Sequence, residues 1–231
     1  MAHRRTEKTV RARPMALQFR PAGRVLPRYC LVCRPARRIH LEALLTSTAV
    51  VALAEIGDKT QLLAIVLATR FKRPWPIVGG IFVATLANHF LAATVGEQAS
   101  VFLDGLWFRY LIAASFIAMA AWTLIPDKFD EDDEPKPSRF GPFVATAIAF
   151  FLVEMGDKTQ LATIALGARF QSVLPVMAGT TIGMMLANVP AVFLGNELIK
   201  RVPLSIVRTV AALLFLVIGL WLLAHTAGWL G

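Results

Sequence analysis

Two short stretches of the sequence place the same ionisable residues inside long apolar segments. "EIGDKTQ" begins at Glu55 and "EMGDKTQ" begins at Glu154, 99 positions later. Each stretch supplies carboxylate, hydroxyl and amide oxygens, which are hard ligands that suit calcium, magnesium or manganese. Zinc and copper would usually call for His or Cys instead. The two stretches therefore predict a site for a hard divalent cation.

The four acids of these stretches are the candidate metal ligands. A central Asp or Lys costs about 2.5–3.5 kcal/mol on the membrane-insertion scale, so these groups are not expected to face lipid. On a continuous helix, residues three positions apart lie about 60° apart, so Glu, Asp and Gln would form one inward stripe. The candidate ligands are Glu55, Asp58, Glu154 and Asp157, and the candidate supporting groups are Gln61, Gln160, Thr60, Thr159, Asn88 and Asn188.

Several of these residues allow two interpretations. Lys59 and Lys158 would balance the acids in the empty site or act as counter-ions along a cavity wall. The asparagines would complete the coordination sphere or form interhelical hydrogen bonds. Gly57 and Gly156 would permit either a helix break or close packing. For the acids themselves, the structural alternative is an ion-pair network that serves stability.

Charge counting suggests what the site exchanges. Four carboxylates and two lysines leave a charge of minus two, which one divalent cation neutralises. Desolvation and like-charge repulsion both favour the protonated form of a carboxylate. Protons and metal would then compete for the same oxygens, and this competition predicts a cation/proton antiporter.

Long apolar segments must position these motifs. The chain is 56% hydrophobic, and apolar runs of about twenty residues recur, the length that crosses a bilayer core of roughly 30 Å. We predict an all-α integral membrane protein in the lipid bilayer, with six transmembrane helices. The segments lie near residues 41–68, 77–96, 106–125, 143–168, 173–194 and 203–224. Gly179 and Gly183, a small-xxx-small pair, predict close helix packing.

The two halves of the chain repeat each other. Besides the motifs, Arg70-Phe71 matches Arg169-Phe170, and residues 86–88 match 186–188. Because each half has three spans, the second must enter the membrane in the opposite direction, which gives two inverted three-helix repeats. The predicted domains are a basic arm (1–40), the first repeat (41–125), an acidic linker (126–142), the second repeat (143–224) and a tail (225–231).

The basic arm holds eleven Lys or Arg residues against one acid, and we expect it to be disordered or adsorbed on the membrane surface. Cys30 and Cys33 have no second pair of ligands at suitable spacing, so we expect no zinc or redox site. Without the arm, the loop charges place the acidic linker in the cytoplasm, whereas the arm's charge argues the reverse. The orientation stays open.

The doubled E-x-G-D-[KR]-[ST] motif, with three spans per half and an acidic linker, resembles the Gdt family of cation/proton exchangers. That family includes animal Golgi transmembrane protein 165 and bacterial manganese exporters. The resemblance covers about residues 41–224 and implies that the four motif acids bind the metal. It also implies transport of manganese, with calcium as the alternative, in exchange for protons, with no bound cofactor.

We therefore predict a secondary transporter, not an enzyme, in the inner or plasma membrane if the chain is bacterial. One alternative is an exporter of amino acids or other small cationic solutes, which would not need two symmetric carboxylate pairs. Another is a membrane-embedded metal-dependent enzyme, which would need asymmetric catalytic groups. We expect no nucleic-acid partner. Metal preference, proton stoichiometry and oligomeric state stay open.

Overall fold

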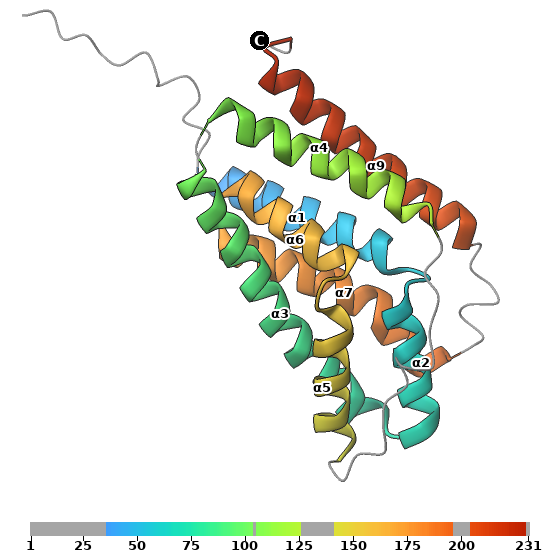
Figure 1. Cartoon of the computed structure of the whole chain (residues 1–231). Coiled ribbons are helices and arrows are strands. Elements are labelled where there is room, and N and C mark those ends of the chain that lie inside the picture. Colours follow the sequence, from blue (N-terminus) through green and yellow to red (C-terminus); the bar gives the residue numbers. More distant parts are fainter. Residues whose placement is uncertain (1–35, 104, 126–140, 196–203, 230–231) are drawn as a thin grey trace, which may run out of the picture. The chain divides into compact units, whose positions relative to one another are not determined.

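The computed structural model describes residues 36–103, 105–125, 141–195 and 204–229. These residues form helices and contain no β-strand, which confirms the all-α prediction for the described part of the chain (Figure 1). The helices are α1 (Ala36–Glu55), α2 (Lys59–Phe71), α3 (Pro74–Phe102), α4 (Leu106–Thr123), α5 (Pro142–Glu154), α6 (Lys158–Phe170), α7 (Val173–Leu194) and α9 (Leu204–Thr226).

Several of these helices are long and apolar enough to cross a membrane. Four pass that test within the described residues: α3, α4, α7 and α9. A fifth candidate is the pair formed by residues 38–55 of α1 and by α2, which are bent by 69° at a short break. Helix α5 is apolar but has only 13 residues. The chain is thus a membrane protein with four or five candidate spans by length and composition.

The first and fourth predicted segments are not continuous helices. Helix α1 ends at Glu55 and α2 begins at Lys59; in the same way, α5 ends at Glu154 and α6 begins at Lys158. The expectation of a single helical stripe of Glu, Asp and Gln is therefore wrong. The reason is local, because a left-handed glycine follows each glutamate by two positions and redirects the chain.

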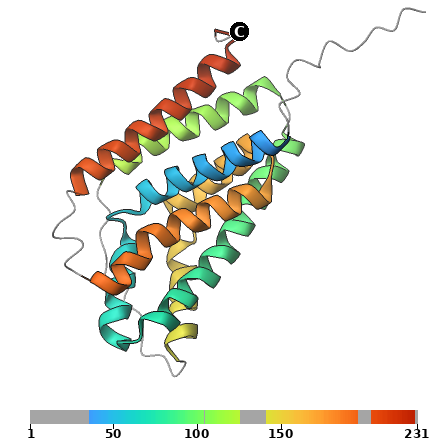
Figure 2. The same cartoon turned by 180° about the vertical axis from the view of Figure 1, so that it is seen from behind.

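The helices of the two halves pack against each other in a reciprocal way. On α7, Gly179 lies against Leu44 of α1, and Gly183 lies against Ala52 further along α1, so these helices run parallel (Figure 2). The Gly179 and Gly183 packing prediction is confirmed. On α3, Gly80 lies against Thr146 of α5. Further along α3, Gly96 lies against the backbone of Ile164 and Ala168 in α6. Helix α3 therefore runs parallel to α5 and α6.

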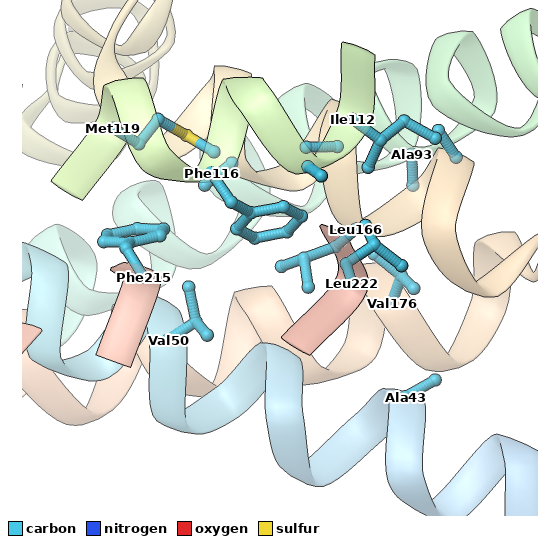
Figure 3. Close-up of a cluster of buried hydrophobic side chains, with 14 of the residues drawn as sticks. Ala43, Val50, Ala93, Ile112, Phe116, Met119, Leu166, Val176, Phe215 and Leu222 are labelled. Atoms are coloured by element: carbon cyan, nitrogen blue, oxygen red, sulfur yellow. The ribbon is translucent and has the colours of Figure 1, made fainter. Parts of the chain in front are cut away.

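Helices α4 and α9 lie side by side in both views (Figures 1 and 2). Phe116 of α4 faces Phe215 of α9 with ring centroids 6.2 Å apart, and Gly219 packs against Ala113 and Ile117. At one end of the pair, Phe108 and Arg109 line the same cavity as Leu222 and His225, so the two helices are antiparallel, as Figure 1 shows. Figure 3 shows this apolar cluster extending to Leu166 of α6.

Three predicted features lie wholly or largely outside the described residues. These are most of the basic arm, the acidic linker up to residue 140, and the Cys30/Cys33 pair. The predicted boundaries at 41–125 and 143–224 enclose most of the described helices.

Candidate metal site

The two helix breaks bring acids from both halves of the chain together. Glu55 is the last residue of α1, Asp58 precedes α2, and Asp157 precedes α6. One carboxylate oxygen from each lies within 4.8 Å of the other two. A cation held at 2.3–2.6 Å by oxygen ligands allows two of them to be about 5 Å apart. The three acids are therefore close enough to share one divalent ion.

These acids are removed from solvent. Glu55 is 0% exposed, Asp58 is 4% exposed and Asp157 is 5% exposed. Burying several carboxylates together is costly unless a cation or protons offset their charge. The oxygen-only donor set suits manganese, calcium or magnesium.

The backbone at each break explains how the aspartates reach the group. Gly57 has φ of 83° and Gly156 has φ of 84°, values that glycine adopts readily and other residues do not. Each aspartate then takes the N-cap position of the next helix with an extended backbone. Neither aspartate caps its own helix with a side-chain hydrogen bond. A negative charge there is favoured by the helix dipole.

The glutamines of the motif hold the breaks in place. Gln61 Oε1 accepts a hydrogen bond from the Gly57 N–H at 3.0 Å, and Gln160 Oε1 accepts one from the Gly156 N–H at 2.7 Å. Both amide oxygens therefore bind the backbone of the break. This differs from the predicted stripe, in which they pointed at the ion together with the acids.

Threonines from both halves bind Glu55. Thr60, in the first turn of α2, donates a hydrogen bond to Glu55 Oε2 at 2.5 Å. Thr159, in the first turn of α6, donates one to the other oxygen, Oε1. Asn188 of α7 lies beside the same carboxylate. Both hydroxyls thus orient the glutamate that belongs to the three-acid group.

Glu154, the fourth predicted ligand, is placed differently. Its side chain is 0% exposed, yet neither carboxylate oxygen accepts a hydrogen bond from the described residues. The charged groups near it are Glu55, Asp157 and Lys59. The structure therefore brings three of the four predicted acids into one group and leaves Glu154 as its neighbour.

The two lysines are not equivalent either. Lys59 acts electrostatically on Glu154. Lys158 is buried, and its Nζ lies 3.4 Å from the carbonyl oxygen of Ile125 and 5.8 Å from the centre of the Trp122 ring. Helix α4 carries Trp122, so this amine is directed toward the end of α4. Lys59 therefore acts on the fourth acid, whereas Lys158 contacts the end of α4.

The asparagines connect the halves. Asn88 Oδ1 accepts a hydrogen bond from Gln160 Nε2 at 2.5 Å. Asn188 Nδ2 donates to the Met184 carbonyl at 3.1 Å, within its own helix. The Asn88 contact is an interhelical hydrogen bond, one of the two roles predicted for this residue.

One buried polar residue of α3 was not among the predicted site residues. His89, next to Asn88 on α3, is 0% exposed, and neither ring nitrogen has a hydrogen-bond partner among the described residues. The sequence signal was available, because His89 has no counterpart at Val189 in the other half. A search for repeated residues passes over such a position.

Comparison with known proteins gives a match on each half. Residues 43–131 and 142–229 match the family described as "Divalent cation/proton antiporter GDT1". The chain is 48% identical over 194 residues to a Vibrio cholerae serotype O1 protein named "Putative manganese exporter", covering 83% of this chain and 96% of that protein.

More distant relatives carry the same family name. GDT1-like protein sll0615 of Synechocystis is 29% identical over 195 residues, covering 76% of this chain and 93% of that protein. GDT1-like protein 5 of Arabidopsis thaliana is 27% identical over 217 residues, covering 78% of this chain and 94% of that protein. No solved structure matches the chain.

Proposed function

This chain belongs to the GDT1 family of divalent cation/proton antiporters, and on that premise we propose that it exports manganese across its membrane in exchange for protons. The family match confirms the predicted resemblance and the predicted class, a transporter and not an enzyme. An exporter of amino acids or other small cationic solutes does not fit this family. Manganese is the metal in the name of the Vibrio cholerae relative, and calcium is the alternative.

The observation that carries the proposal is the buried group of Glu55, Asp58 and Asp157, with their oxygens within 4.8 Å of one another. We infer that these acids bind the transported ion and that Glu154 also takes part in the site during the cycle. Protonation of the carboxylates would release the metal, because both bind the same oxygens. That competition couples metal movement in one direction to proton movement in the other.

We also propose that the chain crosses the membrane six times, as two inverted three-helix repeats. The broken pairs α1–α2 and α5–α6 would be the first and fourth spans. Parallel packing of α1 with α7, and of α3 with α5 and α6, supports this topology. In an inverted repeat of three spans, the first and fifth spans run in the same direction, as do the second and fourth. The antiparallel packing of α4 with α9, the third and sixth spans, agrees with it.

Helix breaks at the site support the same topology. Secondary transporters built from inverted repeats bind their substrates near the bilayer midplane, often where helices are discontinuous. Here both breaks supply acids to one buried group, one from each half. For a bacterial chain we place the transporter in the inner membrane.

The proposal is tested by metal-driven proton flux in proteoliposomes that contain the purified full chain. Parent protein is compared with Glu55→Gln and Asp157→Asn, using manganese, calcium and magnesium in separate assays. Glu97→Gln is the matched control, because Glu97 lies in α3 outside the three-acid group. We expect manganese-driven proton flux in the parent and the control, and its loss in both site variants. Parent-level manganese transport by both site variants would rule out the assigned site.

A further inference from the structure

The two halves carry the same motif but make different contacts. Glu55 accepts hydrogen bonds from both Thr60 and Thr159. Its counterpart Glu154 accepts none from the described residues, although it is equally buried. Equivalent residues in inequivalent surroundings indicate that the structure has adopted one of two arrangements that the repeat makes available.

The glutamines show the same inequality. Gln61 Nε2 donates to the backbone carbonyl of Ala187 at 3.1 Å. Gln160 Nε2 donates to the side-chain oxygen of Asn88 at 2.5 Å. Each glutamine thus reaches the Leu-Ala-Asn segment of the opposite half, at residues 186–188 or 86–88. One contact is to the alanine carbonyl and the other is to the asparagine side chain.

The unused acceptor is present and buried. Asn188 Oδ1 has no hydrogen-bond partner among the described residues, and Asn188 is 0% exposed. It belongs to the residue next to Ala187, whose carbonyl Gln61 now binds. A short displacement of α2 relative to α7 would therefore let Gln61 exchange one acceptor for the other. The amide oxygen of Gln61 can stay on the Gly57 N–H throughout.

We propose that Asn88 and Asn188 are positioning residues that alternate as acceptors for the two glutamines when the transporter changes the side to which its site opens. In the present arrangement Asn88 holds Gln160. In the opposite arrangement Asn188 holds Gln61, and Gln160 binds the carbonyl of Ala87. This inference rests on the proposed antiport, because inverted repeats exchange conformations as access alternates.

The same exchange assigns alternating roles to the glutamates. The threonine hydroxyls that now bind Glu55 would bind Glu154 in the opposite arrangement. Asp58 and Asp157 would stay with the ion, since each belongs to a different half and both already lie in the group. The glutamate that joins them would then depend on the side to which the site opens.

The test compares Asn88→Ala with Asn188→Ala in proteoliposomes. Protection of a terminal tag shows which face of the protein points outward in each preparation. The half-saturating manganese concentration is measured from each face, and the ratio of the two values reports the balance between the arrangements. Asn88→Ala removes a bond of the present arrangement. Asn188→Ala removes a bond of the opposite arrangement, and with it the smaller contact that Asn188 makes with Glu55 in the present one. One lost hydrogen bond of about 1 kcal/mol changes an equilibrium about fivefold.

We expect the ratio to move in opposite directions in the two variants, so that they differ by up to about 25-fold. A purely structural role would lower activity equally from both faces and leave the ratio unchanged. Thr94→Ala is the control. It removes a polar side chain of the same helix, α3, whose hydroxyl bonds to the Phe90 carbonyl of its own helix. Shifts in the same direction, a shift in one variant only, or no shift would overturn the proposal.

Gln160→Ala separates the loss of a contact from the exchange of acceptors. It removes a donor from both arrangements, to Asn88 in the present one and to the carbonyl of Ala87 in the opposite one, so its ratio should stay near that of the parent while that of Asn88→Ala shifts. Its lost bond to Gly156 is common to both arrangements and cancels in the ratio. Manganese-driven proton flux in the parent protein reports separately on the proposed function. If the parent transports manganese and the ratios do not diverge, the inference about the asparagines is wrong, while the proposed function still holds.

Discussion

Replacing the two motif glycines by alanine should separate backbone strain from side-chain crowding at the helix breaks. Gly57 and Gly156 have almost the same φ, 83° and 84°. Their surroundings differ. A Cβ at Gly57 would lie 2.8 Å from Cδ2 of Leu204, whereas a Cβ at Gly156 would have no heavy atom of the described residues within 4 Å. Gly156→Ala therefore measures the strain of a left-handed alanine, and Gly57→Ala measures that strain plus a clash.

The magnitudes follow from these geometries. A left-handed residue other than glycine costs about 1–2 kcal/mol. Pushing the Leu204 side chain about 30° off its rotamer costs about 0.5–1.5 kcal/mol more. For a chain of this size, 1 kcal/mol corresponds to a Tm change of about 2–4 °C. Gly156→Ala should thus lower Tm by about 2–8 °C, and Gly57→Ala should lower it further by about 1–6 °C.

Thermal unfolding in detergent, followed by tryptophan fluorescence, measures both changes. Leu204→Ala, alone and combined with Gly57→Ala, completes a double-mutant cycle. Truncating Leu204 should bring the effect of Gly57→Ala down to that of Gly156→Ala. If Gly156→Ala leaves Tm unchanged, the left-handed break does not exist in solution. If the leucine truncation does not reduce the effect of Gly57→Ala, the clash is not its cause.

Three further predictions test other parts of the structure. Thr60→Val and Thr159→Val each remove a hydrogen-bond donor to Glu55. These donors favour the metal-binding carboxylate over its protonated form, so protons should compete better in the variants. The pH of half-maximal manganese transport should rise by about one to two units, from a bond of about 1.5–3 kcal/mol. Gly179→Leu should overpack the contact of α7 with the α1 backbone and lower Tm in detergent, at a cost of about 1–3 kcal/mol. Manganese at 100 times its Kd should stabilise the parent by about 2.7 kcal/mol, and Glu55→Gln should abolish the resulting rise in Tm.

Much of the helical layout could be predicted from sequence because apolar length is a strong local signal. The six predicted segments each contain a helix or a broken pair, within a few residues at most ends. The breaks themselves were harder to predict. Glycine between two acids is compatible with packing or with a break, and only the observed φ of Gly57 and Gly156 decides between them.

The candidate site could be predicted only in part, for a different reason. The acids were identifiable because intramembrane charge is rare and costly. Their grouping was not, because symmetry in the sequence suggests two equal Glu/Asp pairs. The bond from Thr159 to Glu55 joins residues 104 positions apart and crosses between the halves. No pattern within a single half contains that information.

The proposed antiport gives the inequality between the glutamates a function. A transporter must release its ion as readily as it binds it, and four acids closing on one cation would oppose release. With Glu55 held by two hydroxyls and Glu154 held by none, three acids lie in the group in this structure. Glu154 is buried beside the group, and a proton bound there would offset the cost of burying its charge. In the proposed cycle, a repeated motif in an asymmetric arrangement would supply both a place for the metal and a place for the proton that replaces it.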